Sequence, residues 1–239
     1  MSSSQKLEEE VLKLKEAEDV TILAHYYQRM EIQEIADHLG DSLGLSRMAR
    51  EADTNYILFA GVDFMAETAS ILNQDKTILI PNPESCCPMA AFLSAKQVKE
   101  YKRKTPKIPV VTYVNSTAAV KAESDICCTS SNSIKIVETI ANEFNTDRIL
   151  FGPDANLADY VEQRSGLKLI KMPPNGHCIT HSLLDVNDIK TSRSQHRDAE
   201  VLVHPECVRG VRELADYVGS TAGMYNRVKN NPSNVDAFI

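Results

Sequence analysis

The chain has 239 residues, a hydrophobic share of 43% and a formal net charge of −7. This size suits one large domain or two to three small ones, and no basic block points to nucleic acid as a partner. The apolar runs are too short to span a membrane, and the acidic N-terminal segment lacks the apolar core of a signal peptide. We therefore expect a cytoplasmic protein that does not associate with membranes.

Six cysteines are present in a chain that is too large to need disulfides for stability. In the reducing cytoplasm a disulfide framework is not expected, so a metal, a cluster or a reactive thiol is the better functional interpretation. For any single cysteine, burial as a small apolar side chain is the simplest reading. The neighbouring pairs Cys86–Cys87 and Cys127–Cys128 also leave open a thiol redox or zinc protein. Against this, no CxxC occurs, and adjacent cysteines form strained disulfides.

Short apolar runs rich in β-branched residues alternate with segments of helical periodicity along the chain. The strand-like runs of the first part are residues 20–26, 55–61 and 76–81, and the helical segments are residues 31–39, 46–53 and 64–73. Continuous apolar strands of this kind are typical of parallel sheets that are buried on both faces. The alternation therefore predicts an α/β fold.

The same order of motifs recurs further along the chain at a fixed distance. Asp63 and Asp154 are 91 positions apart (154 − 63 = 91), and the same distance separates Cys87 from Cys178 and Asn115 from Glu206. Polar landmarks align as well as apolar ones, which generic α/β spacing does not explain. We predict a pseudo-three-fold tandem of three-layer α/β/α units with mostly parallel sheets.

The repeat also predicts the limits of the domains. Residues 1–107 would contain an N-terminal helix and the first repeat, residues 108–198 the second repeat, and residues 199–239 the start of a third. The equivalent of Cys178 in a third repeat falls beyond residue 239, so we expect the third unit to be incomplete.

Polar side chains end the first strand of each repeat, where α/β proteins place their ligand sites. They are His25 with Tyr27, Tyr113 with Asn115, and His204 with Glu206. A turn rich in hydroxyl groups and a new helix follow each strand, which makes Ser42, Ser130, Ser220 and Thr221 candidate anion ligands at helix N-termini. Ordinary helix capping is the simplest alternative for each hydroxyl alone.

The repeat distance selects Cys87, and not Cys86, as the partner of Cys178. If three units pack around a common axis, these two cysteines and an implied third describe a three-cysteine cluster or metal site. An iron–sulfur cluster with one open iron acts as a Lewis acid. Cys86 is then expected either to be packed or to lie next to the ligands without binding the cluster, and Cys127, Cys128 and Cys207 are expected to lie in the core.

Ten short motifs together identify the family that the chain resembles. They are LAHYYQ (23–28), GDSLGLSR (40–47), GVDFMAE (61–67), CPMA (87–90), YVNS (113–116), CTSSN (128–132), FGPDANLA (151–158), NGHC (175–178), HPEC (204–207) and GST (219–221). With these motifs the chain resembles quinolinate synthase, the iron–sulfur enzyme of NAD biosynthesis, from about residue 5 onward.

The resemblance implies a reaction, a cofactor and a set of site residues. The reaction is the condensation of iminoaspartate with dihydroxyacetone phosphate to quinolinate, with release of phosphate and water. The cofactor is a [4Fe-4S] cluster held by three cysteines, of which Cys87 and Cys178 match two. Tyr27 and Glu206 match proton-transfer groups, with His204 beside them. The substrate-binding set is His25, Ser42, Tyr113, Asn115, Ser130, His204, Glu206 and Thr221.

The resemblance also carries an expectation about cluster binding. The third cluster cysteine of the family is expected beyond residue 239, so we expect the chain by itself to hold a cluster poorly and to show little activity. The alternative function is an inactive or non-catalytic form that binds anionic small molecules or metal on the same scaffold. The substrate iminoaspartate implies a functional link to L-aspartate oxidase or aspartate dehydrogenase.

Overall fold

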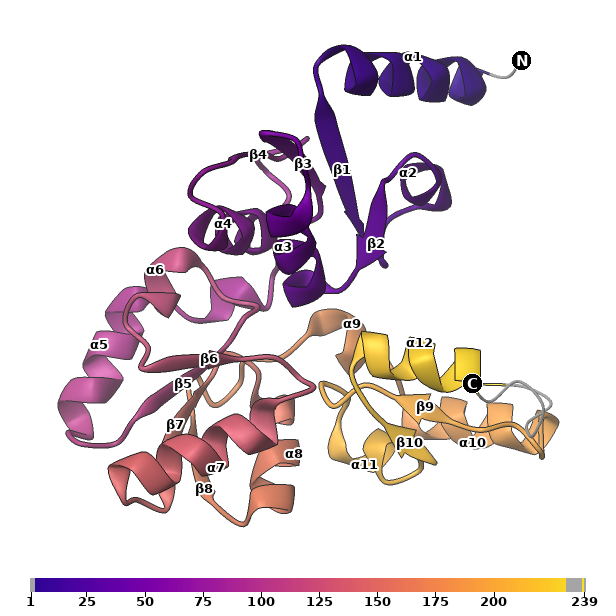
Figure 1. Ribbon diagram of the computed structural model, residues 1–239. Helices are drawn as coiled ribbons and strands as arrows, with labels where there is room; N and C mark the ends of the chain where they lie inside the picture. Colours follow the sequence, from indigo (N-terminus) through magenta and orange to yellow (C-terminus); the bar gives the residue numbers. More distant parts are fainter. Residues whose placement is uncertain (1–2, 231–237, 239) are drawn as a thin grey trace. The chain divides into compact units, whose positions relative to one another are not determined.

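The computed structural model describes residues 3–230 and residue 238 (Figure 1). Contacts within the chain divide it into two compact units, Met1–Cys87 and Pro88–Ile239. Within the described residues, no helix combines the length and the apolar character that crossing a membrane requires.

The first unit is built on a parallel sheet with the strand order β2-β1-β3-β4. Its strands are β1 (Val20–His25), β2 (His38–Gly40), β3 (Tyr56–Ala60) and β4 (Thr77–Leu79), and its helices are α1 (Ser3–Ala17), α2 (Met30–Glu34), α3 (Ser42–Glu51) and α4 (Asp63–Leu72). Helices α3 and α4 pack against each other and against the sheet. Apolar side chains such as Leu23, Phe59 and Phe64 are fully buried there.

The second unit contains a parallel sheet with the equivalent strand order, β6-β5-β7-β8. The strands are β5 (Val110–Tyr113), β6 (Ile126–Cys128), β7 (Arg148–Gly152) and β8 (Lys168–Lys171), accompanied by the short helix η1 (Ala90–Phe92) and by α5 (Ala95–Lys104), α6 (Ala118–Lys121), α7 (Ser133–Phe144) and α8 (Ala155–Ser165). Helices α9 (Ile179–Ser182) and α10 (Val186–Gln195) follow β8. The third repeat then starts with the parallel pair β9 (Leu202–Val203) and β10 (Tyr217–Val218), together with α11 (Arg209–Arg212) and α12 (Thr221–Asn230).

Helices cover both faces of the second sheet. Val98 of α5 and Val120 of α6 share an apolar cluster with Leu150 of β7. Ile149 and Phe151, the neighbours of Leu150 along the strand, are also fully buried. Because successive strand side chains point to opposite faces, these two must lie on the other face of the sheet, where α7 and α8 pack against β7. The unit therefore has the predicted three layers.

The first two strands of every repeat pair in the same register. The paired residues are 15 positions apart each time (38 − 23 = 15): Leu23 with His38, Val111 with Ile126, and Leu202 with Tyr217. Equal register in three separate stretches supports the internal repeat that the sequence predicts.

One aspartate per repeat fixes this register through a pair of hydrogen bonds, which we call the aspartate clamp. Its backbone N–H donates to the carbonyl of a residue in the first strand or directly before it, and its carboxylate accepts the N–H of the same residue. The three clamps are Asp37 on Ile22 (N–H to carboxylate, 2.8 Å), Asp125 on Val110 (2.7 Å) and Asp216 on Val201 (3.0 Å). Each clamp gives hydrogen-bond partners to the backbone N–H and carbonyl of a residue that the short second strand leaves unpaired.

The α/β class, the parallel sheets and the sequence of two four-stranded units followed by a partial third are confirmed. The helix expected over residues 31–39 is wrong in its second half, because α2 ends at Glu34 and His38–Gly40 forms β2. Asp37 explains the difference, since its clamp joins the chain to β1 and ends the helix. The common axis and the domain limits 107/108 and 198/199 stay predictions.

Candidate active site

The polar residues at the ends of the first strands lie where the sequence predicts. His25 is the last residue of β1, Tyr113 is the last residue of β5, and His204 directly follows β9. All three are buried, and so is Glu206. Buried polar groups at strand ends are costly unless they are partnered, so their partners reveal what the site is built to do.

Two of these residues are histidines with the same local geometry. The backbone N–H of Tyr27 donates to Nδ1 of His25 at 3.2 Å, and that of Glu206 donates to Nδ1 of His204 at 3.3 Å. Burial lowers the pKa of each histidine to about 4, so both are neutral near pH 7. Since Nδ1 accepts a hydrogen bond, the ring proton lies on Nε2, and each histidine presents an N–H donor.

Ser130 lies beside His204, and Tyr113 lies beside Glu206. Nε2 of His204 lies 3.3 Å from the Ser130 hydroxyl, in the loop after β6. Burial and the neighbouring Glu206 carboxylate raise the pKa of Tyr113 well above its usual value. The tyrosine therefore keeps its proton and donates it in a hydrogen bond.

Glu206 is the acid among these buried strand-end residues. Burial opposes its ionisation, but the close contact with His181 and its positive charge outweigh that effect and lower the pKa of Glu206. Its Oε2 lies 3.0 Å from Nδ1 of His181, and its Oε1 lies 3.8 Å from Nδ1 of His204. Glu206 is therefore an ionised carboxylate in a nearly dry setting, where it can accept a proton.

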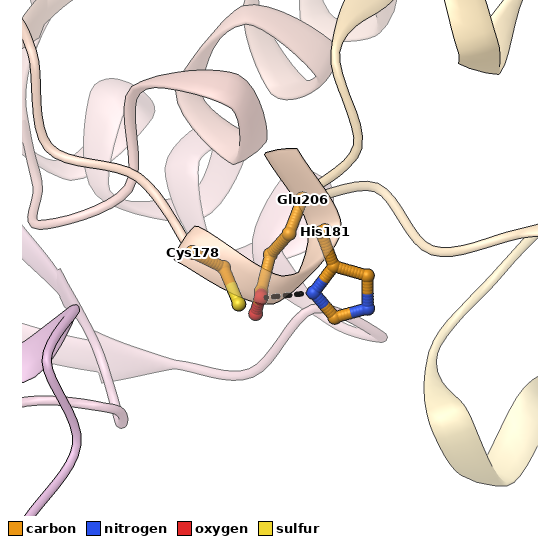
Figure 2. A group of neighbouring side chains, drawn as sticks. All are labelled: Cys178, His181 and Glu206. Carbon is orange, nitrogen blue, oxygen red and sulfur yellow. Dashed lines mark ion pairs between the residues drawn. The ribbon is translucent and has the colours of Figure 1, made fainter. Parts of the chain in front are cut away.

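His181 was not predicted as a site residue. It lies on α9, three positions after Cys178, so both side chains are on the same side of that helical turn. Figure 2 shows the Cys178 sulfur, the Glu206 carboxylate and the His181 ring facing one another. Burial alone would lower the pKa of His181, but Cys178 and Glu206 raise it to about 10. The Cys-x-x-His spacing was the signal that sequence reasoning missed.

Asp154 fixes the backbone that carries Cys178. Its carboxylate caps α8 by accepting the N–H of Leu157 at 2.6 Å, and it also accepts the N–H of Cys178 at 2.9 Å. Two positions before Asp154 the chain requires a glycine, because a Cβ at Gly152 would lie 2.1 Å from the Met172 carbonyl oxygen. Burial raises the pKa of Asp154 to about 7, and the charge of Glu206 adds to this effect.

Four of the predicted site residues belong to the first unit. Tyr27 is 63% exposed, and its ring meets that of His25 edge-on at 4.6 Å. Ser42 is the first residue of α3, but the capping side chain is Asp41, which accepts the N–H of Gly44 at 2.7 Å. Cys87 is half-buried in the loop after β4.

The other predicted hydroxyl and amide groups lie in the second unit. Thr221 starts α12, where Ser220 accepts the N–H of Gly223 at 3.2 Å. Asn115 is half-buried just after β5.

The six cysteines are thiols, and they differ in burial. Cys128 and Cys207 are buried in the core, as predicted. Cys127 is half-buried on β6. Cys86 is exposed, so the expectation that it is packed is wrong, and a position next to the cluster ligands stays a prediction.

Comparison with known proteins identifies the family. The Quinolinate synthetase A protein family matches residues 9–239. The quinolinate synthase of Pyrococcus abyssi is 50% identical over 216 residues, which cover 90% of this chain and 71% of that protein. The quinolinate synthase of Methanothermobacter thermautotrophicus is 46% identical over 234 residues, which cover 98% of this chain and 75% of that protein. This chain therefore belongs to the quinolinate synthase family of enzymes.

Proposed function

We propose that the chain condenses iminoaspartate with dihydroxyacetone phosphate to quinolinate, with release of phosphate and water, in NAD biosynthesis. Family membership supports the reaction, and the setting of Glu206 carries it. Glu206 is a buried, ionised carboxylate between histidine and tyrosine side chains, after a parallel strand. A carboxylate in this state can take a proton from a carbon beside a carbonyl or imine group and return it elsewhere.

The neutral histidines suit the binding of substrate oxygen atoms. His204 and His25 each present Nε2–H, because Nδ1 accepts a backbone N–H. A neutral imidazole donates a hydrogen bond to a carbonyl or carboxylate without losing its proton, so it can stabilise developing negative charge. Ser130 lies beside His204 and would bind the same group.

The remaining binding residues carry hydroxyl and amide groups, which suit a phosphate and two carboxylates. We assign this role to Ser42 and Thr221, at the starts of α3 and α12, together with Tyr113 and Asn115. Tyr27 would be a second proton-transfer group, and it is 63% exposed.

The cysteines suit a [4Fe-4S] cluster by residue type and setting. Cys87 and Cys178 are half-buried thiols on the loops after β4 and β8, which are the fourth strands of their sheets. We propose that both ligate the cluster, and Asp154 would hold the Cys178 backbone in place for it. A bound cluster would supply Lewis-acid assistance to the loss of water through an iron that no cysteine ligates.

The chemistry of the substrate implies a supplier. Iminoaspartate is the two-electron oxidation product of L-aspartate, and it hydrolyses readily in water. We therefore propose a functional link to an L-aspartate oxidase or aspartate dehydrogenase.

The test is quinolinate formation from iminoaspartate, generated in the assay from L-aspartate, and dihydroxyacetone phosphate. The chain is reconstituted anaerobically, its iron and acid-labile sulfide are measured, and quinolinate is measured by mass spectrometry. Quinolinate that disappears in Glu206→Gln supports the proposal. A folded chain that contains the cluster but forms no quinolinate contradicts it.

The alternative function is a non-catalytic protein that binds anionic small molecules. This function would be distinguished by binding of dihydroxyacetone phosphate, measured by calorimetry, with no formation of quinolinate even when the cluster is bound. In that case Ser130→Ala would weaken binding, whereas Glu206→Gln would strengthen it by removing a negative charge that faces the anion.

A further inference from the structure

We propose that Cys178, His181 and Glu206 form a binding site for a single divalent transition-metal ion with the ligand preferences of Zn²⁺ when the chain carries no iron–sulfur cluster. All three residues lie in the second compact unit. The proposal does not depend on the reaction proposed above, although the site would share Cys178 with the cluster.

The first support is geometry. One possible ligand atom from each residue, the sulfur, a ring nitrogen and a carboxylate oxygen, lies within 4.8 Å of the other two. The nitrogen–oxygen pair, Nδ1 of His181 and Oε2 of Glu206, is already 3.0 Å apart. Figure 2 shows the three groups converging from α9 and from the turn after β9. Ligand atoms around a tetrahedral zinc ion are roughly 3–4 Å apart, since each lies about 2.0–2.3 Å from the ion. A small contraction would therefore complete the site.

The second support is the setting of the His181 nitrogen. Nδ1 of His181 is buried and lies 3.0 Å from the Glu206 carboxylate, but among the described residues the contact does not have the angles of a hydrogen bond. The neighbouring His204 differs, because its Nδ1 accepts the N–H of Glu206. An ion between the His181 nitrogen and the carboxylate would contact both groups in place of this ion pair.

The third support is the chemistry of the donor set. A thiolate, an imidazole and a carboxylate together suit zinc and similar transition-metal ions, whereas magnesium and calcium prefer oxygen alone. Three protein ligands leave a fourth position for water, as in catalytic zinc sites. On binding, the ion would replace the proton of the Cys178 thiol and the proton on Nδ1 of His181. No electron transfer is involved.

The surroundings would hold two of the ligands in place. Asp154 accepts the backbone N–H of Cys178 at 2.9 Å. The His181 ring stacks on the His204 ring at a centroid distance of 4.8 Å and an interplanar angle of 23°. Outer partners of this kind orient ligands and raise metal affinity. An ion bound here would occupy Glu206 and Cys178 and would therefore block the proposed reaction.

The test is metal binding by the cluster-free chain, residues 1–239, purified under reducing, anaerobic conditions. Zn²⁺ affinity is measured by competition with a chromophoric chelator, and Co²⁺ serves as the spectroscopic probe. We expect a single tight site, a sulfur-to-cobalt charge-transfer band and strong visible absorption typical of four-coordinate cobalt. His181→Gln should weaken Zn²⁺ binding by about 100-fold or more, since even partners outside the ligand set are worth about 10–100-fold.

The matched control is His177→Gln, which removes a nearby histidine outside the site whose ring contacts Phe92. It should leave Zn²⁺ affinity unchanged, and so should Cys207→Ser. Cys178→Ser should abolish the charge-transfer band, and circular dichroism should show that each variant is folded. Equal affinities for His181→Gln and His177→Gln would overturn the proposal. So would a cobalt spectrum without a sulfur band, and both results can be read even if Cys178→Ser does not fold.

Discussion

The ends of β1 and β9 share a backbone arrangement but differ in the residue that carries the chemistry. In both, a buried neutral histidine accepts the N–H of the residue two positions later. That residue is Tyr27 after β1 and Glu206 after β9. Tyr27 is 63% exposed, whereas Glu206 is buried against His181.

The difference shows how a repeated fold can produce unequal sites. The backbone hydrogen bond depends only on the strand end, so every repeat that places histidine there obtains an Nε2–H donor. The residue two positions after the histidine depends on its surroundings, and in the second unit His181 of α9 lies beside it. The repeat therefore provides the binding donors, and a neighbouring element, α9, provides the partner of the proton-transfer group.

Replacement of Glu206 should produce the largest effect. Glu206→Gln keeps the shape of the side chain but removes the charge, so the rate of quinolinate formation should fall by about 10²–10⁴-fold. Tyr27→Phe should cost less, because the exposed tyrosine has water as a substitute. The two variants are compared by their steady-state rates of quinolinate formation, measured at matched cluster content. Equal losses for the two would contradict the difference between the strand ends.

The buried histidine of the first unit should make stability depend on pH. The unfolded chain binds a proton at His25 below about pH 6.5, whereas the folded chain does so only below about 4. Stability from the neutral histidine is therefore present above pH 6.5 and is lost as the pH falls toward 4, by up to about 3 kcal/mol. Urea unfolding at pH 7 and pH 5 measures this loss. In His25→Gln the loss should be smaller, and an unchanged pH dependence would contradict the assignment.

The loops that follow β4 and β8 can be compared in how closely their backbones pack against neighbouring residues. Gly176 and Ser85 are equivalent by the repeat, and each accepts a backbone N–H, from Ala155 and Asp63 respectively, at 2.8 Å. A Cβ at Gly176 would lie 2.0 Å from the Pro153 carbonyl oxygen. Gly176→Ala should therefore destabilise the second unit by about 1–3 kcal/mol. Ser85→Ala is the matched control and should be nearly neutral in thermal unfolding. A neutral Gly176→Ala would show that the loop can move away.

Much of this architecture was predictable because it depends on local patterns. Apolar runs such as residues 55–61 predicted strands, and the spacing of Asp63 and Cys87 from their repeats predicted equivalent units. Burial on both faces demands such runs, so the signal is strong. The short second strands were missed, since three residues such as His38–Gly40 carry no periodicity.

The site was predictable only in part, for a related reason. Sequence position indicated His204 and Glu206, which follow a strand, but not how deeply they are buried. His181 approaches Glu206 from another element, 25 positions earlier in the chain (206 − 181 = 25), and no local pattern encodes that contact. The repeat distance aligns positions in the sequence but does not indicate burial, so it could not predict that Cys86 is exposed.

Replacement of the clamp aspartates should have the smallest effect on the free energy of unfolding. The variants test whether the clamps stabilise the repeats equally. Asp125 accepts the N–H of Val110 at 2.7 Å but remains exposed, so water can replace part of the bond. Asp125→Ala should lower the free energy of unfolding by about 1 kcal/mol, and Asp125→Asn by less, because the amide oxygen still accepts. Asp216→Ala should cost more, since this clamp also pairs with Arg193 and holds a sheet of only two strands. Urea unfolding measures all three. If Asp216→Ala cost less than Asp125→Ala, the third repeat would depend on its helices rather than on its strand pair.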